Sequence, residues 1–165
     1  MKAILWICLF ATIITSACSK NSSWKKGGGV EIYQLKNYQM AAGKCKVESS
    51  GINFFDDPIV SNSEIVSYDQ RQHQFAVKPA AKERLRLLMD RDALAVFVNG
   101  EPLYYFINKP MYSSSTCFES ISMSLSGDNY VVMHLGYPGY GTTQVQDLRN
   151  HISLLQILRS QGKLL

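Results

Sequence analysis

The sequence has few of the residues and motifs that most often reveal an enzyme. It contains only three histidines, His73, His134 and His151, and none of them stands at the H-x-H or H-x-x-x-H spacing of a metal site. It has no G-x-S-x-G nucleophile motif and no glycine-rich loop carrying the lysine of a phosphate site. The adjacent carboxylates Asp56 and Asp57 point apart rather than across a substrate. The sequence therefore predicts no catalytic residue, no metal and no cofactor.

The chain also lacks a dominant charge and, beyond its N-terminus, a long apolar run. Its formal net charge is +4, and the basic residues are interleaved with acidic ones instead of forming the basic stripe of a nucleic-acid binder. No later segment reaches the 18 or so continuous apolar residues that a transmembrane helix needs. We therefore expect no nucleic-acid partner and no membrane span. A length of 165 residues is within the range of one domain.

The N-terminus has the three parts of a secretory signal. Lys2 is followed by the apolar run AILWICLFATII and then by TSAC, in which Cys18 stands directly after a small residue. This pattern resembles the lipobox of bacterial lipoproteins, where cleavage occurs before a cysteine that then carries the lipid. Thr15 stands where that family usually has Leu. The alternative is an ordinary secretory signal with Cys18 as an incidental residue.

The lipobox resemblance implies that residues 1–17 are removed and that Cys18 is acylated, with palmitate among its chains. The protein would then be anchored to a bacterial membrane, with its body facing the periplasm or the exterior. Residues 18–29 are rich in Ser, Lys and Gly and predict a flexible tether, so residues 30–165 form the expected single domain. Cys45 and Cys117 remain in an oxidising compartment, where they either pair or stay as two separate thiols.

Alternating apolar residues predict strands in several places. VEIYQL begins the domain at Val30, HQFAV covers 73–77, and ESISMSL and YVVMHLG follow later in the chain. ALAVFV and EPLYYFIN flank Asn99-Gly100, the strongest short signal for a type I′ hairpin, and Pro102 suggests an edge position or a bulge. EIVSYD reads as a short turn or helical piece, and residues 36–63 as an irregular loop.

Two helices are expected. One begins at Pro79, with Ala81, Leu85, Leu88 and Met89 on its apolar face and a solvated charged face opposite. The other follows a capping box at Thr143 and Gln146. Together the elements predict an α+β fold with a mostly antiparallel sheet of about four to five strands and two helices packed on one face.

The middle of the chain carries a second resemblance. The run IVSYDQRQHQFAVKPAAKERL, followed by AVFVNGEPLYYFI, resembles the head subdomain of the first periplasmic domain of the translocase subunit SecD, and also related uncharacterised exported bacterial proteins. It covers about a third of the chain. The resemblance implies a small extracytoplasmic module that contacts other proteins, but no motor activity, because the expected membrane spans of SecD are missing here.

Aromatic residues supply the candidate binding surface, because alternate residues of a hairpin must face outward and exposed tyrosine suits contact surfaces. The candidates are Tyr104, Tyr105, Phe106, Tyr112, Tyr137 and Tyr140. The alternative is that helices and loops cover both faces of the hairpin. We therefore expect a non-catalytic binding module whose partner is another envelope protein. The alternatives are an accessory of secretion or envelope assembly related to the SecD head and, third, a thiol-dependent enzyme using Cys117.

Overall fold

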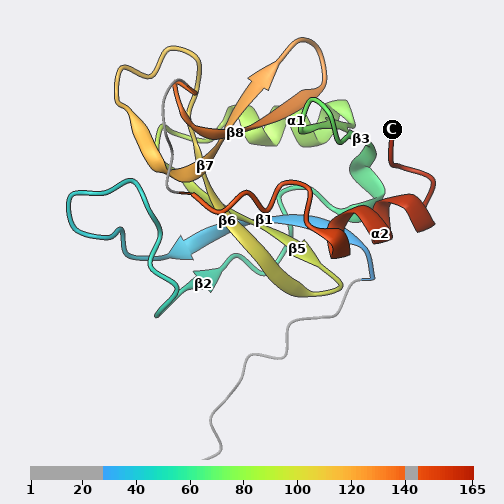
Figure 1. Ribbon diagram of the computed structural model, residues 1–165, viewed down its shortest axis with the longest axis horizontal. Helices are drawn as coiled ribbons and strands as arrows, with labels where there is room; N and C mark the ends of the chain where they lie inside the picture. The colour runs from blue at the N-terminus through green and yellow to red at the C-terminus, as the bar shows by residue number, and fades with distance from the viewer. Residues whose placement is uncertain (1–27, 140–144) are drawn as a thin grey trace, which may run out of the picture.

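The computed structural model describes residues 28–139 and 145–165 (Figure 1). The expected signal segment, Cys18, most of the tether, Tyr140 and Thr143 lie outside these residues. The elements in chain order are β1 (Val30–Asn37), β2 (Asn53–Phe54), the 3-10 helix η1 (Asn62–Glu64), β3 (Ile65–Asp69), β4 (Gln74–Val77), α1 (Pro79–Arg86), β5 (Ala93–Val98), β6 (Glu101–Asn108), β7 (Cys117–Ser126), β8 (Tyr130–Tyr137) and α2 (Ile152–Ser160).

The strands form one eight-stranded mixed sheet in the order β2-β1-β5-β6-β7-β8-β4-β3. The expected sheet of about four to five strands was therefore wrong. The two-residue β2 is too short to carry a periodic signal, and the EIVSYD segment, predicted as a turn or helical piece, is the edge strand β3. This segment forms a hairpin with β4, and on its other side Tyr68 pairs with the C-terminal residues around Leu164, a contact that a local pattern does not encode.

One pair, β6 with β7, is parallel, and only Phe106–Asn108 pair with Ile121–Met123. Parallel neighbours normally need a crossover of a dozen or more residues. Residues 109–116 suffice here because the paired stretch is short. The return from the level of Met123 to Cys117 at the start of β7 spans about 20 Å at 3.3 Å per residue, which eight residues can cover. The sequence shows a polar loop at this place but not the direction in which the chain re-enters the sheet.

The hairpin of β5 and β6 has the predicted turn. Asn99 and Gly100 have φ values of 53° and 81°, so both central residues adopt the positive φ of a type I′ turn. The register shifts where Phe97 pairs with Pro102, which confirms the irregularity predicted for the proline. All six residues of β5 are buried, so this strand lies in the centre of the molecule.

Both helices differ in part from their prediction. Helix α1 begins at Pro79 as predicted but ends at Arg86, and Met89 is 73% exposed rather than on a buried face. Lys82, predicted on a solvated face, is buried. Helix α2 begins only at Ile152, where the Nδ1 atom of His151 accepts a hydrogen bond from the main-chain N–H of Ser153. Residues 145–148 belong to no helix or strand, so the apolar spacing there did not produce a helix.

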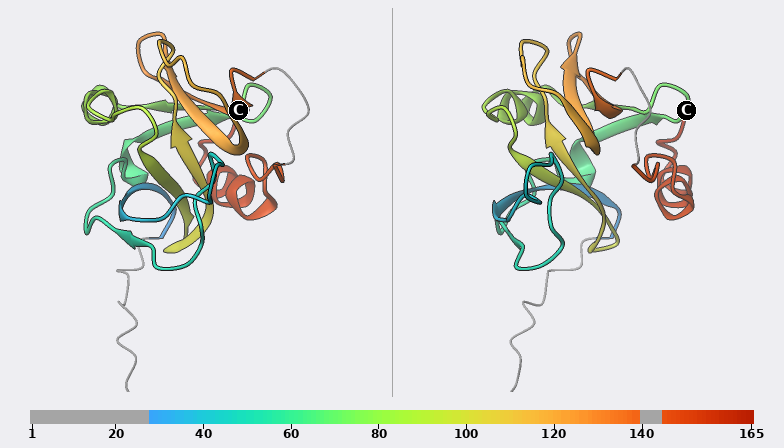
Figure 2. Two further views of the ribbon diagram at one scale, coloured as in Figure 1. Left: turned by 90° about the vertical axis from the view of Figure 1, so that its left-hand side faces the viewer. Right: turned by 60° about the vertical axis from the view of Figure 1, so that its left-hand side comes forward.

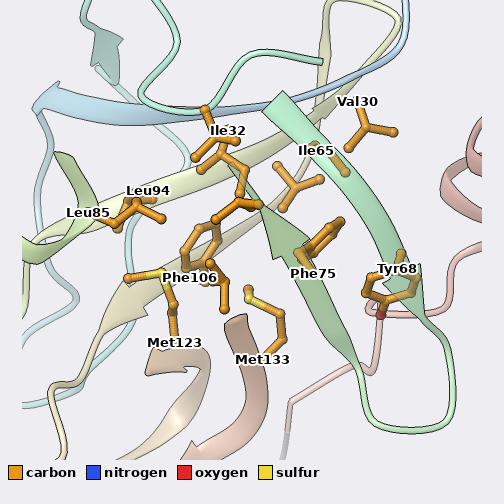
Figure 3. Close-up of a cluster of buried hydrophobic side chains, with 14 of the residues drawn as sticks. Val30, Ile32, Ile65, Tyr68, Phe75, Leu85, Leu94, Phe106, Met123 and Met133 are labelled. Carbon is orange, nitrogen blue, oxygen red and sulfur yellow. The ribbon is translucent and has the colours of Figure 1, made fainter. Parts of the chain in front are cut away.

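The sheet curls around one main core. In Figure 3 the side chains of β1, β3, β4, β6, β7 and β8 point toward one another, and α1 contributes Leu85. Helix α2 adds Leu154 and Leu158 to the same cluster, so both helices pack on this side of the sheet. Short segments cover the outer edges: Val60 pairs beside Ile32 of β1, and the C-terminal Leu164 pairs beside β3. Covered edges of this kind oppose sheet-to-sheet aggregation.

A second, smaller cluster lies on the other side of β1 and β5, beneath the loop that follows β1. Phe97 is at its centre, with ring centroids 4.6 Å from Tyr33 and 5.0 Å from Phe54. Cys45 and Cys117 form a disulfide across it, which joins this loop to the start of β7. Of the two alternatives left open by the sequence, the structure has the paired one.

Candidate functional site

The structure separates the six aromatic residues of the predicted binding surface. Tyr104 and Phe106 are buried in the main core, so neither is an exposed contact residue. Tyr105 is half-buried and stacks on Phe54 at 6.5 Å. Tyr104 and Tyr105 also line a pocket of about 260 Å³ where β6 and β7 separate. Tyr140 lies outside the described residues, and Tyr112 is the most exposed of the set at 83%.

The other candidate chemical groups are dispersed as well. Cys117 is 1% exposed and disulfide-bonded, so no thiolate is available for the thiol-dependent alternative. The Nε2 atom of His134 lies 2.8 Å from the hydroxyl of Ser124, and His151 caps α2. Burial lowers the pKa of His73, whose Nδ1 atom is buried without a hydrogen-bond partner. No group of three metal-ligating side chains occurs within residues 28–139 and 145–165.

One surface instead combines a pocket with strongly exposed apolar side chains. The pocket has a volume of about 310 Å³ and lies between α1, the end of β6 and the edge of β7. Its lining comprises Lys82, Leu85, Arg86, Leu88, Asn108, Pro110, Met111, Tyr112, Leu125 and Gly127. Leu85 and Leu88 are buried and continue into the main core. The pocket therefore has an apolar floor formed by side chains that packing holds in place.

The four most exposed large apolar side chains of the described residues lie in the two segments around this pocket. They are Leu87 and Tyr112, each 83% exposed, Met111 at 78% and Met89 at 73%. We call these four residues the apical patch. Single exposed apolar residues are ordinary, but several that gather beside a pocket indicate an interaction site. Figure 1 and Figure 2 place α1 and the 109–116 loop at one end of the molecule, with the start of β1 toward the other.

Asn108 ties the segment after α1 to the end of β6. Its side-chain amide donates to the main-chain carbonyls of Leu88 and Met89, at 3.2 and 2.8 Å. Its main-chain N–H and C=O also pair with Asp92 and Arg91. Asn108 is buried, so each of these bonds is protected from water. The two segments that carry the apical patch are therefore held in one fixed arrangement.

Lys109 holds the 109–116 loop in place from the inside. Its fully buried ammonium donates to the Asp90 carboxylate at 3.0 Å and to the hydroxyls of Ser113 and Ser115 at 2.9 and 2.6 Å. Both hydroxyls in turn donate to the other Asp90 oxygen. All three N–H groups of the ammonium are thus satisfied, which makes the network a structural support and leaves no lone pair for a base.

The groups around Lys109 and Asp90 stabilise these two residues as an ion pair. Partial burial tends to raise the pKa of Asp90, but the hydrogen bonds from Lys109, Ser113 and Ser115 outweigh it and hold that pKa below its ordinary value. Tyr137 lies beneath the ammonium, with its ring centroid 5.4 Å from Nζ. The Tyr137 hydroxyl reaches the main-chain carbonyls of Met111 and Ser113 at 3.2 Å each. Tyr137 is therefore a support of the loop rather than a contact surface.

The pocket is basic. Lys82 and Arg86 line it, and no carboxylate does. The buried Lys82 ammonium donates to the main-chain carbonyls of Gly127 and Asp128 and forms no ion pair with a described residue. Arg86 pairs with Glu83 at 2.9 Å, but both side chains are more than half exposed, so this pair contributes little. The pocket wall therefore carries positive charge that the described residues compensate only in part.

Sequence reasoning found Tyr112 at this surface but missed the rest of it. The signal that was present is the pair Met111-Tyr112 inside the otherwise polar stretch NKPMYSSST, where nothing local explains two apolar residues. Met89 carried no such signal, because it continues the apolar helical spacing of Leu85 and lies beyond the end of α1 at Arg86. Leu87 stands directly after α1 and was not assigned to either face.

No helix of the described residues is long and apolar enough to cross a membrane. Comparisons with protein-family models, with curated proteins and with solved structures found no match to this chain.

Proposed function

We propose that the chain is a lipid-anchored protein of the bacterial envelope whose folded domain binds another envelope protein through the apical patch, without catalysis of its own. The observation that carries this proposal is that the four most exposed large apolar side chains of the described residues belong to the two segments around one pocket. Met111 and Tyr112 line the pocket, and Leu87 and Met89 flank Leu88, which also lines it. Asn108 and Lys109 hold these segments in place. A rigid apolar surface loses little conformational entropy when a partner covers it, which favours binding.

The position of the patch supports a partner that lies away from the anchoring membrane. The expected lipid is attached at Cys18, shortly before the start of β1, whereas α1 and the 109–116 loop lie toward the other end of the domain (Figure 2). The anchor is tested by metabolic labelling with palmitate. Label is expected in the wild type and absent in Cys18→Ala, and label that persists in the variant would refute the anchor.

The binding role is tested by site-specific photo-crosslinking in intact cells. A benzoylphenylalanine at Tyr112 is expected to give a discrete adduct, whose partner is then identified by mass spectrometry. The control places the same residue at Ile152 of α2, which is 59% exposed and belongs to a different surface. Adducts of equal yield at both positions, or none at Tyr112, would contradict a role for the patch. Loss of the adduct in Met111→Ser would support it.

A further inference from the structure

We propose that the pocket beside the apical patch binds an extended acidic peptide segment, which adds a short strand to the open edge of β7 at Leu125 and brings a carboxylate to Lys82 and Arg86. This inference rests on the proposed binding function and specifies the chemistry of the partner. Three features of the pocket carry it, namely an unpaired strand edge, an apolar floor and a positively charged wall that is compensated only in part.

The open edge follows from the hydrogen-bond pattern of β7. The main-chain N–H of Lys109 donates to the carbonyl of Met123 at 2.8 Å, so the polar main-chain groups of Met123 point toward β6 and away from β8. Residues two apart in a strand direct these groups to the same side. The N–H and C=O of Leu125 therefore point to the β6 side as well.

No strand of the described residues occupies that side at Leu125. The pairing of β6 with β7 ends where Asn108 meets Met123, and Pro110 then turns the chain away from the sheet. The place that β6 vacates is the pocket, since Leu125, Asn108 and Pro110 all line it. An extended peptide in this position would continue the sheet and satisfy the Leu125 main-chain groups, which is how peptides add to exposed strand edges.

The apolar floor accepts one side chain of such a peptide. Leu85 and Leu88 form the floor, and Met111 and Tyr112 form an adjustable rim beside it. A volume of about 310 Å³ is at the lower end for ligand pockets, which suits one or two side chains better than a large cofactor. Methionine adapts to side chains of different shape, so the rim favours apolar character without requiring one residue type.

The charge of the pocket selects an acidic peptide. Lys82 is 3% exposed and its ammonium contacts neutral carbonyls only, so a buried positive charge lacks a counter-ion among the described residues. Burying a charge without a partner is costly, and a carboxylate that arrives with a ligand removes part of that cost. Arg86 at the rim is free to leave its weak pair with Glu83 and bind the carboxylate in a bidentate manner.

A peptide fits these features better than a lipid does. An acyl chain would fill the apolar floor but would bury the Leu125 N–H and C=O without hydrogen-bond partners, which is unfavourable for each unsatisfied group. An extended peptide satisfies them and delivers its carboxylate from the same backbone. The strand edge is therefore the feature that decides between the two occupants.

The experiment uses the full lipidated protein in detergent micelles and a displayed library of random ten-residue peptides as the probe. Selected peptides are expected to share an acidic residue next to an apolar one. Their affinity, measured by fluorescence anisotropy, should fall by about tenfold or more in Arg86→Glu and by a smaller factor in Arg86→Lys, which keeps the charge but not the bidentate contact. The matched control is Arg71→Glu, which reverses an exposed charge in the turn between β3 and β4 and should leave the affinity unchanged.

Amide hydrogen exchange provides the readout for strand addition. The Leu125 amide is expected to exchange rapidly in the protein alone and to slow by about a hundredfold with a selected peptide bound. The Ser124 amide, whose residue pairs with Val132 of β8, should exchange slowly in both states. Peptides that bind but leave Leu125 exchange unchanged, or that show no acidic preference, would overturn the inference while leaving the patch as a binding surface. Failure to select any peptide would also overturn it, and the photo-crosslink at Tyr112 would separately decide the proposed function.

Discussion

The disulfide between Cys45 and Cys117 gives the sharpest test of how this fold is stabilised. We consider its removal by replacing both cysteines with alanine. The bond spans 72 positions of the chain, and both residues are buried, at 7% and 1% exposure. It fastens the loop after β1 over the second core cluster, which includes Val47 and Phe97.

The expected loss follows from the loop that the bond closes. In the chain-entropy model a loop of this size restricts the unfolded chain by about 4 kcal/mol at 25 °C. Removing two buried sulfur atoms from the second cluster adds roughly 1 kcal/mol of lost packing. Because domains of this kind have a total stability of about 5–15 kcal/mol, the double variant should remain folded but lose a large fraction of its margin.

The assay is urea denaturation followed by circular dichroism, with the free energy of unfolding extrapolated to water. Wild-type protein that is reduced while unfolded and refolded in reductant serves as the control, since it loses the same crosslink without a change in sequence. Both samples should lose the same free energy to within about 1 kcal/mol. A loss below about 1 kcal/mol in both would refute the reasoning, because the loop after β1 would then be held by its packing alone.

Three further substitutions test single features of the structure. Lys109→Met leaves the Asp90 carboxylate without its buried partner and should lower the free energy of unfolding by roughly 3 kcal/mol, measured by urea denaturation. Tyr104→Phe removes a buried hydroxyl that has no hydrogen-bond partner. It should therefore raise the melting temperature, by the equivalent of about 1 kcal/mol in the free energy of unfolding, and a lower melting temperature would contradict this. Hydrogen bonds from Arg84 lower the pKa of Glu64 to about 2 from an ordinary 4.5. The ionised Glu64 carboxylate therefore contributes fully to stability above pH 4.5, and this contribution is lost as the pH falls toward 2. Glu64→Gln should therefore show a smaller fall in melting temperature between about pH 5 and about pH 2 than the wild type, and an equal fall would assign the acid dependence to other groups.

The parts of the fold that the sequence predicted well are those with local causes. The type I′ turn depends on two neighbouring residues, Asn99 and Gly100, that tolerate positive φ. The start of α1 depends on Pro79, whose ring fixes φ and whose missing N–H costs nothing in a first turn. The long apolar alternation of β7 and β8 required only a period of two.

The parts that were missed depend on neighbours far away in sequence. The β3 segment has its local hairpin partner β4 on one side, but on the other side Tyr68 pairs with the remote C-terminal residues Lys163 and Leu165. The apolar spacing before α2 did not yield a helix until Ile152, because Val145 and Leu148 pack against the main core without helical structure. A helical period shows that one face is apolar, but the partner surface decides which conformation buries it.

The residues of the candidate site fall into the same two groups, those that a local pattern indicates and those that only the tertiary structure brings together. The sequence pointed to Tyr112 as an exposed aromatic residue, and it assigned no chemistry to Asn108 or Lys109. Those two residues became visible only when the structure brought Asp90 and the segment after α1 beside the end of β6. Equally, the outward-facing rule for hairpins suggested Tyr104 and Phe106, which the curled sheet encloses on its inner side.

The sequence by itself determined the composition of the core, the turn at Asn99-Gly100 and the lipobox-like segment at Cys18, because each is written in a short contiguous stretch. Only the tertiary structure decided the eight-strand order, the pairing of Cys45 with Cys117 and the pocket between α1 and β7. Each of these depends on the distance between residues remote in the chain. That distance is set by how the whole apolar surface is buried, a property that no local pattern contains.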